Sequence, residues 1–372
     1  MSAAEHVDHV GSLLRPPALT KAWFAHEAGK LSAEKLAAEQ DAAIRDAVKM
    51  QEEIGLAFVT DGEFRRGGWS RGFLTAVDGF GFKPSKLVFK NDQGVSTAAP
   101  APFATGKLRQ KQPIVAGDFA FLKSCAKRRA KVTMPTPSHM HFGHFGECFD
   151  RKAYASLEAF FDDMIAIYRA EIADLAARGC TFLQLDEVPL TLLCDETNRG
   201  IAKAQGDDPE RLVDLYIDLV NRAVAERPKT MRVALHLCRG NMQGLWMGDG
   251  GYAPIAEKLF NQLNVDAYLM EYDSPRAGDF APLRHVPKGK QVFLGLVSTK
   301  NPAVETADAL KRKLDEAAKY APADQLGLCP QCGFASSAMS KFNVLPNPMT
   351  PALQRAKLAR LVEVAGQAWG GG

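Results

Sequence analysis

Eight short apolar runs, most of them followed by an amphipathic helical stretch, restrict the fold of this chain more than any other feature of its sequence. The runs are nearly continuous in apolar residues, which is typical of strands that are covered on both faces. Strands of this kind, joined by helices, form parallel sheets. The expected strands are residues 9–12, 56–63, 131–139, 181–187, 232–238, 266–273, 291–298 and 325–333.

The expected helices alternate with these strands and cover residues 33–54, 154–177, 209–226, 252–263, 280–284, 304–320 and 351–368. Eight strand–helix units predict an α/β fold of the closed (β/α)8, TIM-barrel type, with residues 1–372 as a single domain. An open doubly wound sheet is the alternative, but no glycine fingerprint follows the first strand. Between residues 64 and 130 the alternation stops, and Gly, Pro and polar residues break up short apolar pieces. This pattern predicts hairpins inserted after the second strand.

Composition excludes several classes of partner. The chain is 46% hydrophobic and 24% charged, with a net charge of only +3, so we expect neither nucleic acid nor a membrane as a partner. The polar first residues do not resemble a signal peptide, and no apolar stretch is long enough to span a bilayer. The seven cysteines are odd in number and scattered, which favours a cytoplasmic protein whose thiols serve a metal or catalysis.

Polar and metal-binding residues gather at the carboxyl ends of the expected strands, where barrels of this type carry their active sites. In chain order these residues are His9 and Ser12, Asp61 and Glu63, Pro137 and His139, Asp186 and Glu187, His236 and Cys238, Glu271 and Asp273, Ser298 and Lys300, and Cys329 and Cys332.

The strongest chemical signal is the pair His236 and Cys238 in "HLCRGN". Residues two apart on a strand project to the same face, so this imidazole and thiol point together. Both are favoured zinc ligands, and zinc usually takes four donors. Glu271 and one cysteine of the "CPQC" sequence at residues 329–332 are candidates for the other two. Taken alone, an H-x-C pair is more often a packing accident, and a lone CxxC is also typical of a redox dithiol.

Six short motifs, in this order, resemble the catalytic zinc barrel of the cobalamin-independent methionine synthase family: "HVGS", "TDGEFRR", "LQLDE", "HLCRGN", "YLMEYD" and "CGF". The resemblance covers residues 9–365 and is greatest to short stand-alone homologues that lack the duplicated amino-terminal barrel. It implies a methyltransferase similar to 5-methyltetrahydropteroyltriglutamate–homocysteine S-methyltransferase. It also implies Zn2+ as cofactor, with His236, Cys238, Glu271 and Cys332 as ligands.

The resemblance further implies that Ser12, Glu63 and Asp186 hold the carboxylate and the amino group of an amino-acid substrate. Paired carboxylates suit an ammonium group, and hydroxyl donors suit a carboxylate. For Glu63, a salt bridge to the neighbouring Arg65 or Arg66 is the structural alternative.

Two departures from the family separate this chain from the full-length synthases. Lys300 stands where they carry a histidine that is thought to help protonate the departing donor, and Ser298 stands where an aspartate is usual. We therefore interpret Lys300 as the catalytic acid, although lysine is a poorer acid near neutrality. His139, His141 and His144 occupy the region of the folate pocket, and we expect His139 or His141 to face the cavity rather than to bind a second metal.

These observations predict a zinc-dependent transfer of a methyl group to a small-molecule thiol, most simply homocysteine, to give methionine. Methyltetrahydrofolate or a methylated corrinoid carrier is the expected donor. One alternative is a zinc thiol alkyltransferase that acts on another thiol or on an electrophile such as an epoxide, but such a thiol leaves Glu63 and Asp186 unpaired. Another alternative is a non-catalytic zinc-binding protein, which requires a saturated metal site.

Overall fold

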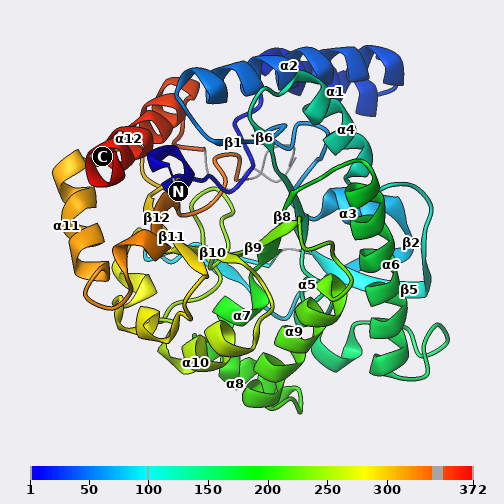
Figure 1. Ribbon diagram of the computed structural model, residues 1–372. Helices are drawn as coiled ribbons and strands as arrows, with labels where there is room; N and C mark the ends of the chain where they lie inside the picture. The colour runs from blue at the N-terminus through cyan, green and yellow to red at the C-terminus, as the bar shows by residue number, and fades with distance from the viewer. Residues whose placement is uncertain (1, 99, 337–346, 371–372) are drawn as a thin grey trace.

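A parallel sheet lies at the centre of the chain's mixed α/β fold (Figure 1). The computed structural model describes residues 2–98, 100–336 and 347–370. Six parallel strands are hydrogen-bonded in the order β12–β11–β10–β9–β8–β7, so each strand lies beside the next one along the chain. Their bounds are β7 Val132–Pro135, β8 Phe182–Glu187, β9 Arg232–Leu237, β10 Ala267–Glu271, β11 Gln291–Val297 and β12 Leu326–Pro330. These six strands confirm six of the eight that the sequence predicts.

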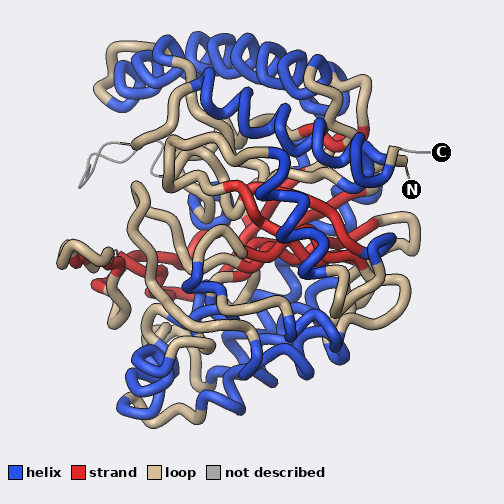
Figure 2. Tube along the Cα trace, turned by 90° about the vertical axis from the view of Figure 1, so that its left-hand side faces the viewer, coloured by secondary structure: helices blue, strands red, loops and turns tan. Residues whose placement is uncertain are grey.

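Helices surround the strands in Figure 1 and lie above and below them in the perpendicular view of Figure 2. The long helices are α2 Ala33–Glu53, α6 Leu157–Ala177, α9 Pro209–Val224, α10 Ala253–Gln262, α11 Ala307–Ala317 and α12 Pro351–Trp369. Five of them begin after a Ser, Asp or Thr whose side chain accepts a hydrogen bond from the first turn: Ser32, Ser156, Asp208, Thr306 and Thr350. The predicted helices are therefore confirmed, except that residues 280–284 form a 3-10 helix, Ala281–His285.

The expected first strand, residues 9–12, is wrong: these residues are not in a strand. The carbonyls of residues 9–11 accept hydrogen bonds from side chains instead of from a neighbouring strand. Lys131 Nζ donates to His9 O, Gln184 Nε2 donates to Val10 O, and Thr60 Oγ1 donates to Gly11 O. The pairing lies slightly earlier in the chain, where Val7 forms an isolated parallel bridge with Leu328 of β12.

The expected second strand is short. β1, Phe58–Val59, pairs in parallel with β6, Arg129–Ala130. A single residue, Lys131, separates β6 from β7, and its backbone N–H donates to Val59 O at 2.9 Å. β1 is therefore held beside the first strand of the six-stranded sheet.

The segment between β1 and β6 contains two antiparallel ladders. β2, Val77–Pro84, pairs with β5, Pro100–Gln110, and β3, Phe89–Lys90, pairs with β4, Ser96–Thr97. Two helices flank these strands, α3 Arg71–Ala76 and α4 Ala116–Cys125. The buried Glu171 of α6 fixes the start of α4, because its carboxylate accepts hydrogen bonds from the backbone N–H groups of residues 114–116.

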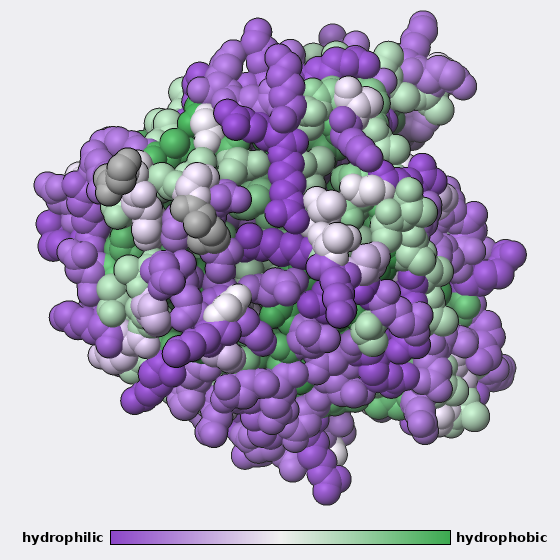
Figure 3. All heavy atoms as spheres, viewed as in Figure 1, coloured by the Kyte–Doolittle hydropathy of each residue, from purple (hydrophilic) through white to green (hydrophobic). Residues whose placement is uncertain are grey.

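The remaining elements are short connections, apart from α1, and were not predicted. They are the helices α1 Pro17–Glu27, α5 His139–Phe142, α7 Pro189–Leu192 and α8 Glu196–Ala204, with the 3-10 helices η1 Ala3–His6, η2 Phe145–Glu147, η3 Pro275–Ala277 and η5 Ala323–Gln325. The face drawn in Figure 3 is mostly hydrophilic, with smaller hydrophobic areas between the polar side chains. Among the described residues, no helix combines the length and the apolar character needed to cross a membrane.

Candidate functional site

Three side chains that the sequence singles out as metal ligands meet at the carboxyl ends of β9 and β12. One possible ligand atom from each of His236, Cys238 and Cys332 lies within 4.8 Å of the others. The sulfur atoms of the two cysteines are 4.0 Å apart. His236 and Cys238 are buried, with 2% and 4% of their surface exposed. Parallel strands end on the same side of a sheet, which is why residues almost one hundred positions apart meet here.

The imidazole of His236 is oriented as a metal ligand would be. Its Nδ1 lies 3.2 Å from Leu269 O, and a carbonyl can only accept, so Nδ1 carries the proton. The other nitrogen, Nε2, is buried and has no hydrogen-bond partner among the described residues. Zinc-binding histidines usually have this arrangement, in which a backbone carbonyl fixes the tautomer and leaves Nε2 with a free lone pair. The donor set therefore fits Zn2+.

The two thiols differ in their tendency to ionise. The hydrogen bond between the sulfur atoms lowers the pKa of Cys332 well below its usual value, against the effect of burial, and raises that of Cys238. The nearby imidazole and the ammonium group of Lys300 also lower the pKa of Cys332. These effects favour the thiolate form of Cys332, and a bound cation would favour it further.

Glu271, the fourth predicted ligand, ends β10 beside this group but is engaged elsewhere. Its Oε1 lies 3.2 Å from Lys300 Nζ, and its Oε2 accepts a hydrogen bond from the backbone of Arg239 at 2.8 Å. Burial alone would raise the pKa of Glu271, but Lys300 and Arg239 outweigh it and lower this pKa. An ionised carboxylate has more lone pairs than these two contacts use, so Glu271 could also bind a metal while it stays paired with Lys300.

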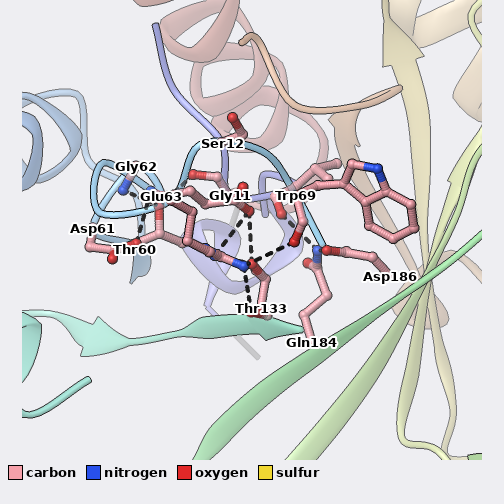
Figure 4. Close-up of polar contacts among 12 residues, drawn as sticks. Gly11, Ser12, Thr60, Asp61, Gly62, Glu63, Trp69, Thr133, Gln184 and Asp186 are labelled. Atoms are coloured by element: carbon pink, nitrogen blue, oxygen red, sulfur yellow. Dashed lines mark hydrogen bonds and ion pairs between the residues drawn. The ribbon is translucent and has the colours of Figure 1, made fainter. Parts of the chain in front are cut away.

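A second polar group surrounds the start of the chain and the end of β1 (Figure 4). Glu63 is buried, and its Oε1 accepts a hydrogen bond from Thr133 Oγ1 at 2.7 Å and lies 3.3 Å from Arg66 Nη2. The salt bridge considered as an alternative for Glu63 is therefore present, with Arg66. Glu63 also has a positive φ of 62°, a strained backbone that is common at functional sites.

Asp186, the last residue but one of β8, lies next to His236, because the Cα atoms of the two residues are paired in register. Its carboxylate is buried, which raises its pKa to about 7. Ser12 is partly buried, and its hydroxyl accepts a hydrogen bond from Arg15 at 3.3 Å. Figure 4 shows Ser12, Glu63 and Asp186 around the same region of the structure.

Gly11 lies between these side chains in a conformation that favours glycine. Its φ is +124°, and a Cβ atom there would lie 2.8 Å from Thr133 Cγ2 and 3.1 Å from Glu63 Oε1. We expect Gly11→Ala to lower the free energy of unfolding by about 3 kcal/mol, because strain and crowding add. Gly29→Ala is the matched control, since Gly29 also has a positive φ, +69°, but a Cβ atom there would have no neighbour within 4 Å. That control should cost about 1 kcal/mol in urea unfolding; equal losses would show that crowding at Gly11 has no effect.

The three histidines of the α5 region lie in different surroundings. His139 packs at a tilt against Trp69, with ring centroids 4.2 Å apart. His141 is fully buried in an aromatic cluster, and its Nδ1 lies 2.8 Å from the hydroxyl of Tyr216. His144 packs edge-on against Phe103. Burial lowers the pKa of His139 and of His141 to about 3, so both rings are neutral at physiological pH.

Several residues of this region are not among those that the sequence predicts for the site. Arg15 donates to the backbone oxygens of Glu63 and Arg66, and burial lowers its pKa to about 10 against the opposing effect of Glu63. Arg15 follows the "HVGS" motif in a segment without a regular pattern, so the sequence gives no signal for a functional role of this residue. Thr133 and Gln184 carried a usable signal, because each is a polar residue inside an apolar strand.

Comparison with known proteins agrees with this geometry. Residues 8–344 match the model of the cobalamin-independent synthase catalytic domain. An uncharacterized protein of Bacillus subtilis, YxjH, is 38% identical over 97% of this chain and 94% of its own length. A methionine synthase of Pyrococcus abyssi is 26% identical over 87% of this chain and 84% of its own. The solved structure of a Listeria monocytogenes protein, described as a candidate vitamin-B12-independent methionine synthase, superposes with a TM-score of 0.72 at 30% identity and covers 98% of this chain and 97% of its own.

Proposed function

The chain belongs to the cobalamin-independent methionine synthase family of methyltransferases, and from this premise we propose that it transfers a methyl group to the thiol of homocysteine to give methionine. The observation that carries the proposal is the convergence of His236, Cys238 and Cys332, with an unpartnered buried Nε2 on the histidine among the described residues. We propose that these residues hold Zn2+, with Glu271 as a fourth ligand. A zinc ion bound there would favour the thiolate form of a substrate thiol at neutral pH.

The remaining side chains would bind and orient the amino acid. We propose that Glu63 and Asp186 hold its ammonium group and that Ser12 holds its carboxylate. The guanidinium group of Arg15, which donates to Ser12 Oγ, would add positive charge near that carboxylate. Asp186 and His236 are neighbours in register, which would keep the ammonium group close to the thiol-binding end. Holding both ends of the substrate aligns the sulfur with the incoming methyl group.

The methyl donor departs as the new bond forms. The substrate sulfur forms a bond to the methyl carbon while the bond from that carbon to the donor breaks, and the donor takes up a proton. We assign this proton to Lys300 Nζ, which is buried beside Glu271. Glu271 and Asp273 raise the pKa of Lys300 against the effect of burial, so the ammonium form is present at neutral pH. Methyltetrahydrofolate is the proposed donor, with His139, which packs at a tilt against Trp69, as a candidate pocket residue. His141 is fully buried among aromatic rings, so it would support such a pocket rather than contact the donor.

We also propose that the strands close into a (β/α)8 barrel that forms one domain with residues 64–130 inserted. Val7 bridges β12, and Lys131 joins β1 to the other edge of the six-stranded sheet. A small apolar cluster joins Val10 and residues of β1, β8, β9, β10, β11 and β12. Such a cluster is expected inside a barrel. A location in the cytoplasm remains a prediction from the sequence.

Production of methionine tests the proposal. We expect zinc-loaded protein to form methionine from homocysteine and methyltetrahydrofolate, measured by mass spectrometry. A methylated corrinoid supplied in a parallel reaction distinguishes the two donors. Formation of a thioether from a thiol without an amino group and an epoxide, but not from homocysteine, would favour the alkyltransferase alternative. A loaded protein that is inactive with every acceptor and donor would favour the non-catalytic zinc protein.

A further inference from the structure

Lys131 is fully buried and uses all three of the N–H bonds of its ammonium group. Lys131 Nζ donates to Asp8 Oδ1 at 2.6 Å, to His9 O at 2.5 Å and to Gln184 Oε1 at 3.0 Å. Lys131, Asp8 and Gln184 all have 0% of their surface exposed. Because an ammonium group has three donors and no acceptor, its position among these three oxygens is fixed.

The lysine also fixes the orientation of the Gln184 amide. An ammonium group can only donate, so Gln184 must turn its oxygen toward Lys131 and its NH2 group the other way. Gln184 Nε2 then donates to Val10 O at 2.6 Å and to Asp186 Oδ1 at 2.7 Å. Turning the amide over would set N–H against the ammonium and oxygen against the carboxylate, both unfavourable in a buried site. Figure 4 shows the Gln184 amide meeting the carboxylate of Asp186.

The carboxylate of Asp186 is consequently held at one oxygen only. Oδ1 receives the N–H of Gln184, whereas Oδ2 receives no hydrogen bond from any residue in the described ranges. Asp186 is 6% exposed. A carboxylate anchored at Oδ1, with Oδ2 left over, can accept one hydrogen bond from a substrate in a defined direction.

We propose that Lys131 and Gln184 are positioning residues, which hold the Asp186 carboxylate so that its second oxygen meets the ammonium group of an amino-acid thiol. This inference rests on the proposed function, because it takes Asp186 as a substrate-binding residue. A lysine that only neutralised Asp8 would not need to contact Gln184. Gln184 in turn would not need to contact Asp186. The chain of hydrogen bonds from Asp8 to Asp186 makes the buried ion pair part of the substrate specificity.

Binding of two thiols to the zinc-loaded, full-length protein tests this role. One is L-homocysteine and the other is 4-sulfanylbutanoate, which has the same carbon chain without the amino group. Gln184→Met keeps the size of the side chain but removes the donor to Asp186. We expect it to weaken homocysteine binding about ten-fold in calorimetry, while binding of 4-sulfanylbutanoate changes less than about two-fold.

A second variant addresses the lysine without leaving a buried charge. The double variant Asp8→Asn with Lys131→Gln replaces the ammonium by an amide, which can either donate or accept, so the Gln184 amide is no longer forced into one orientation. It should reduce the preference for homocysteine in the same way as Gln184→Met. Gln325→Met is the matched control: Gln325 is also buried, and its Nε2 donates to two carbonyls, Pro287 O and Lys290 O, near the start of β11. This control should change neither affinity.

The outcomes separate the inference from the function on which it rests. Loss of the preference in both variants, with the control unchanged, supports the positioning role. A wild-type protein that prefers homocysteine, together with folded variants that keep the preference, would overturn the inference and leave the proposed function intact. A wild-type protein that binds both thiols equally would overturn the amino-acid substrate itself, and the inference with it.

Discussion

Replacing Cys332 by serine is expected to remove the bound zinc and to slow methyl transfer by a factor on the order of a thousand. Cys332 and Cys238 supply the two sulfur atoms of the ligand group, which lie 4.0 Å apart. Without one of them the site would lose an anionic donor and hold zinc more weakly. Zinc content by elemental analysis and the rate of methionine formation measure the two effects.

Cys329→Ser is the matched control, because Cys329 belongs to the same "CPQC" sequence. Its thiol is fully buried within β12, 3.5 Å from Phe293 O, and lies outside the ligand group. This variant should lose some stability but keep its zinc and most of its activity. If Cys329→Ser lost the metal and Cys332→Ser kept it, the assignment of the ligand within this sequence would be wrong.

Replacing Lys300 by methionine is expected to lower kcat on the order of a hundred-fold, with little change in KM for homocysteine. General acid catalysis usually contributes factors of this size. Loss of the ion pair with the fully buried Glu271 would also destabilise the protein, so the folded fraction must be measured alongside the rate. A rise in KM without a fall in kcat would point to binding rather than to proton transfer.

Lys300→His tests whether Lys300 donates a proton or only supplies a positive charge. The pKa of Lys300 is raised, so the lysine stays protonated as the pH increases through neutrality. A histidine has a pKa of about 6.5 and loses its proton above that pH. We therefore expect the histidine variant to recover part of kcat near pH 6 and to lose it as the pH rises to about 8, whereas the wild-type protein shows no such fall. Identical pH profiles for the two proteins would contradict the role of Lys300 as an acid.

The sequence predicts that His236, Cys238 and a cysteine of the "CPQC" sequence meet, and the structure brings His236, Cys238 and Cys332 together. His236 and Cys238 are two residues apart on one strand, so their common direction follows from strand geometry alone. Their meeting with Cys332 follows from the parallel arrangement of β9 and β12, which the alternation of strands and helices predicts. The ends of the expected strands therefore locate most of the candidate site.

Side-chain contacts that replace regular backbone pairing could not be predicted in this way. Residues 9–12 look like a strand, but Lys131, Gln184 and Thr60 bind the carbonyls of residues 9–11. No local pattern reveals partners so distant in sequence. The ion pair between Glu271 and Lys300 could not be predicted for the same reason. The sequence places each residue at a strand end, but it does not show that the two side chains pair. In a buried polar network, each donor must find an acceptor in three dimensions. The periodicity of apolar residues along the sequence does not show which partners meet.

X-ray absorption at the zinc edge, with and without homocysteine, tests the central claim most directly. The account predicts one zinc ion per chain with two sulfur ligands, from Cys238 and Cys332, and the appearance of a third sulfur when homocysteine is added. Cys332→Ser should remove the signal, and Cys329→Ser should leave it unchanged. A purified protein that takes up no zinc, or a zinc shell that does not change with homocysteine, would contradict the assignment of this chain as a thiol-activating methyltransferase.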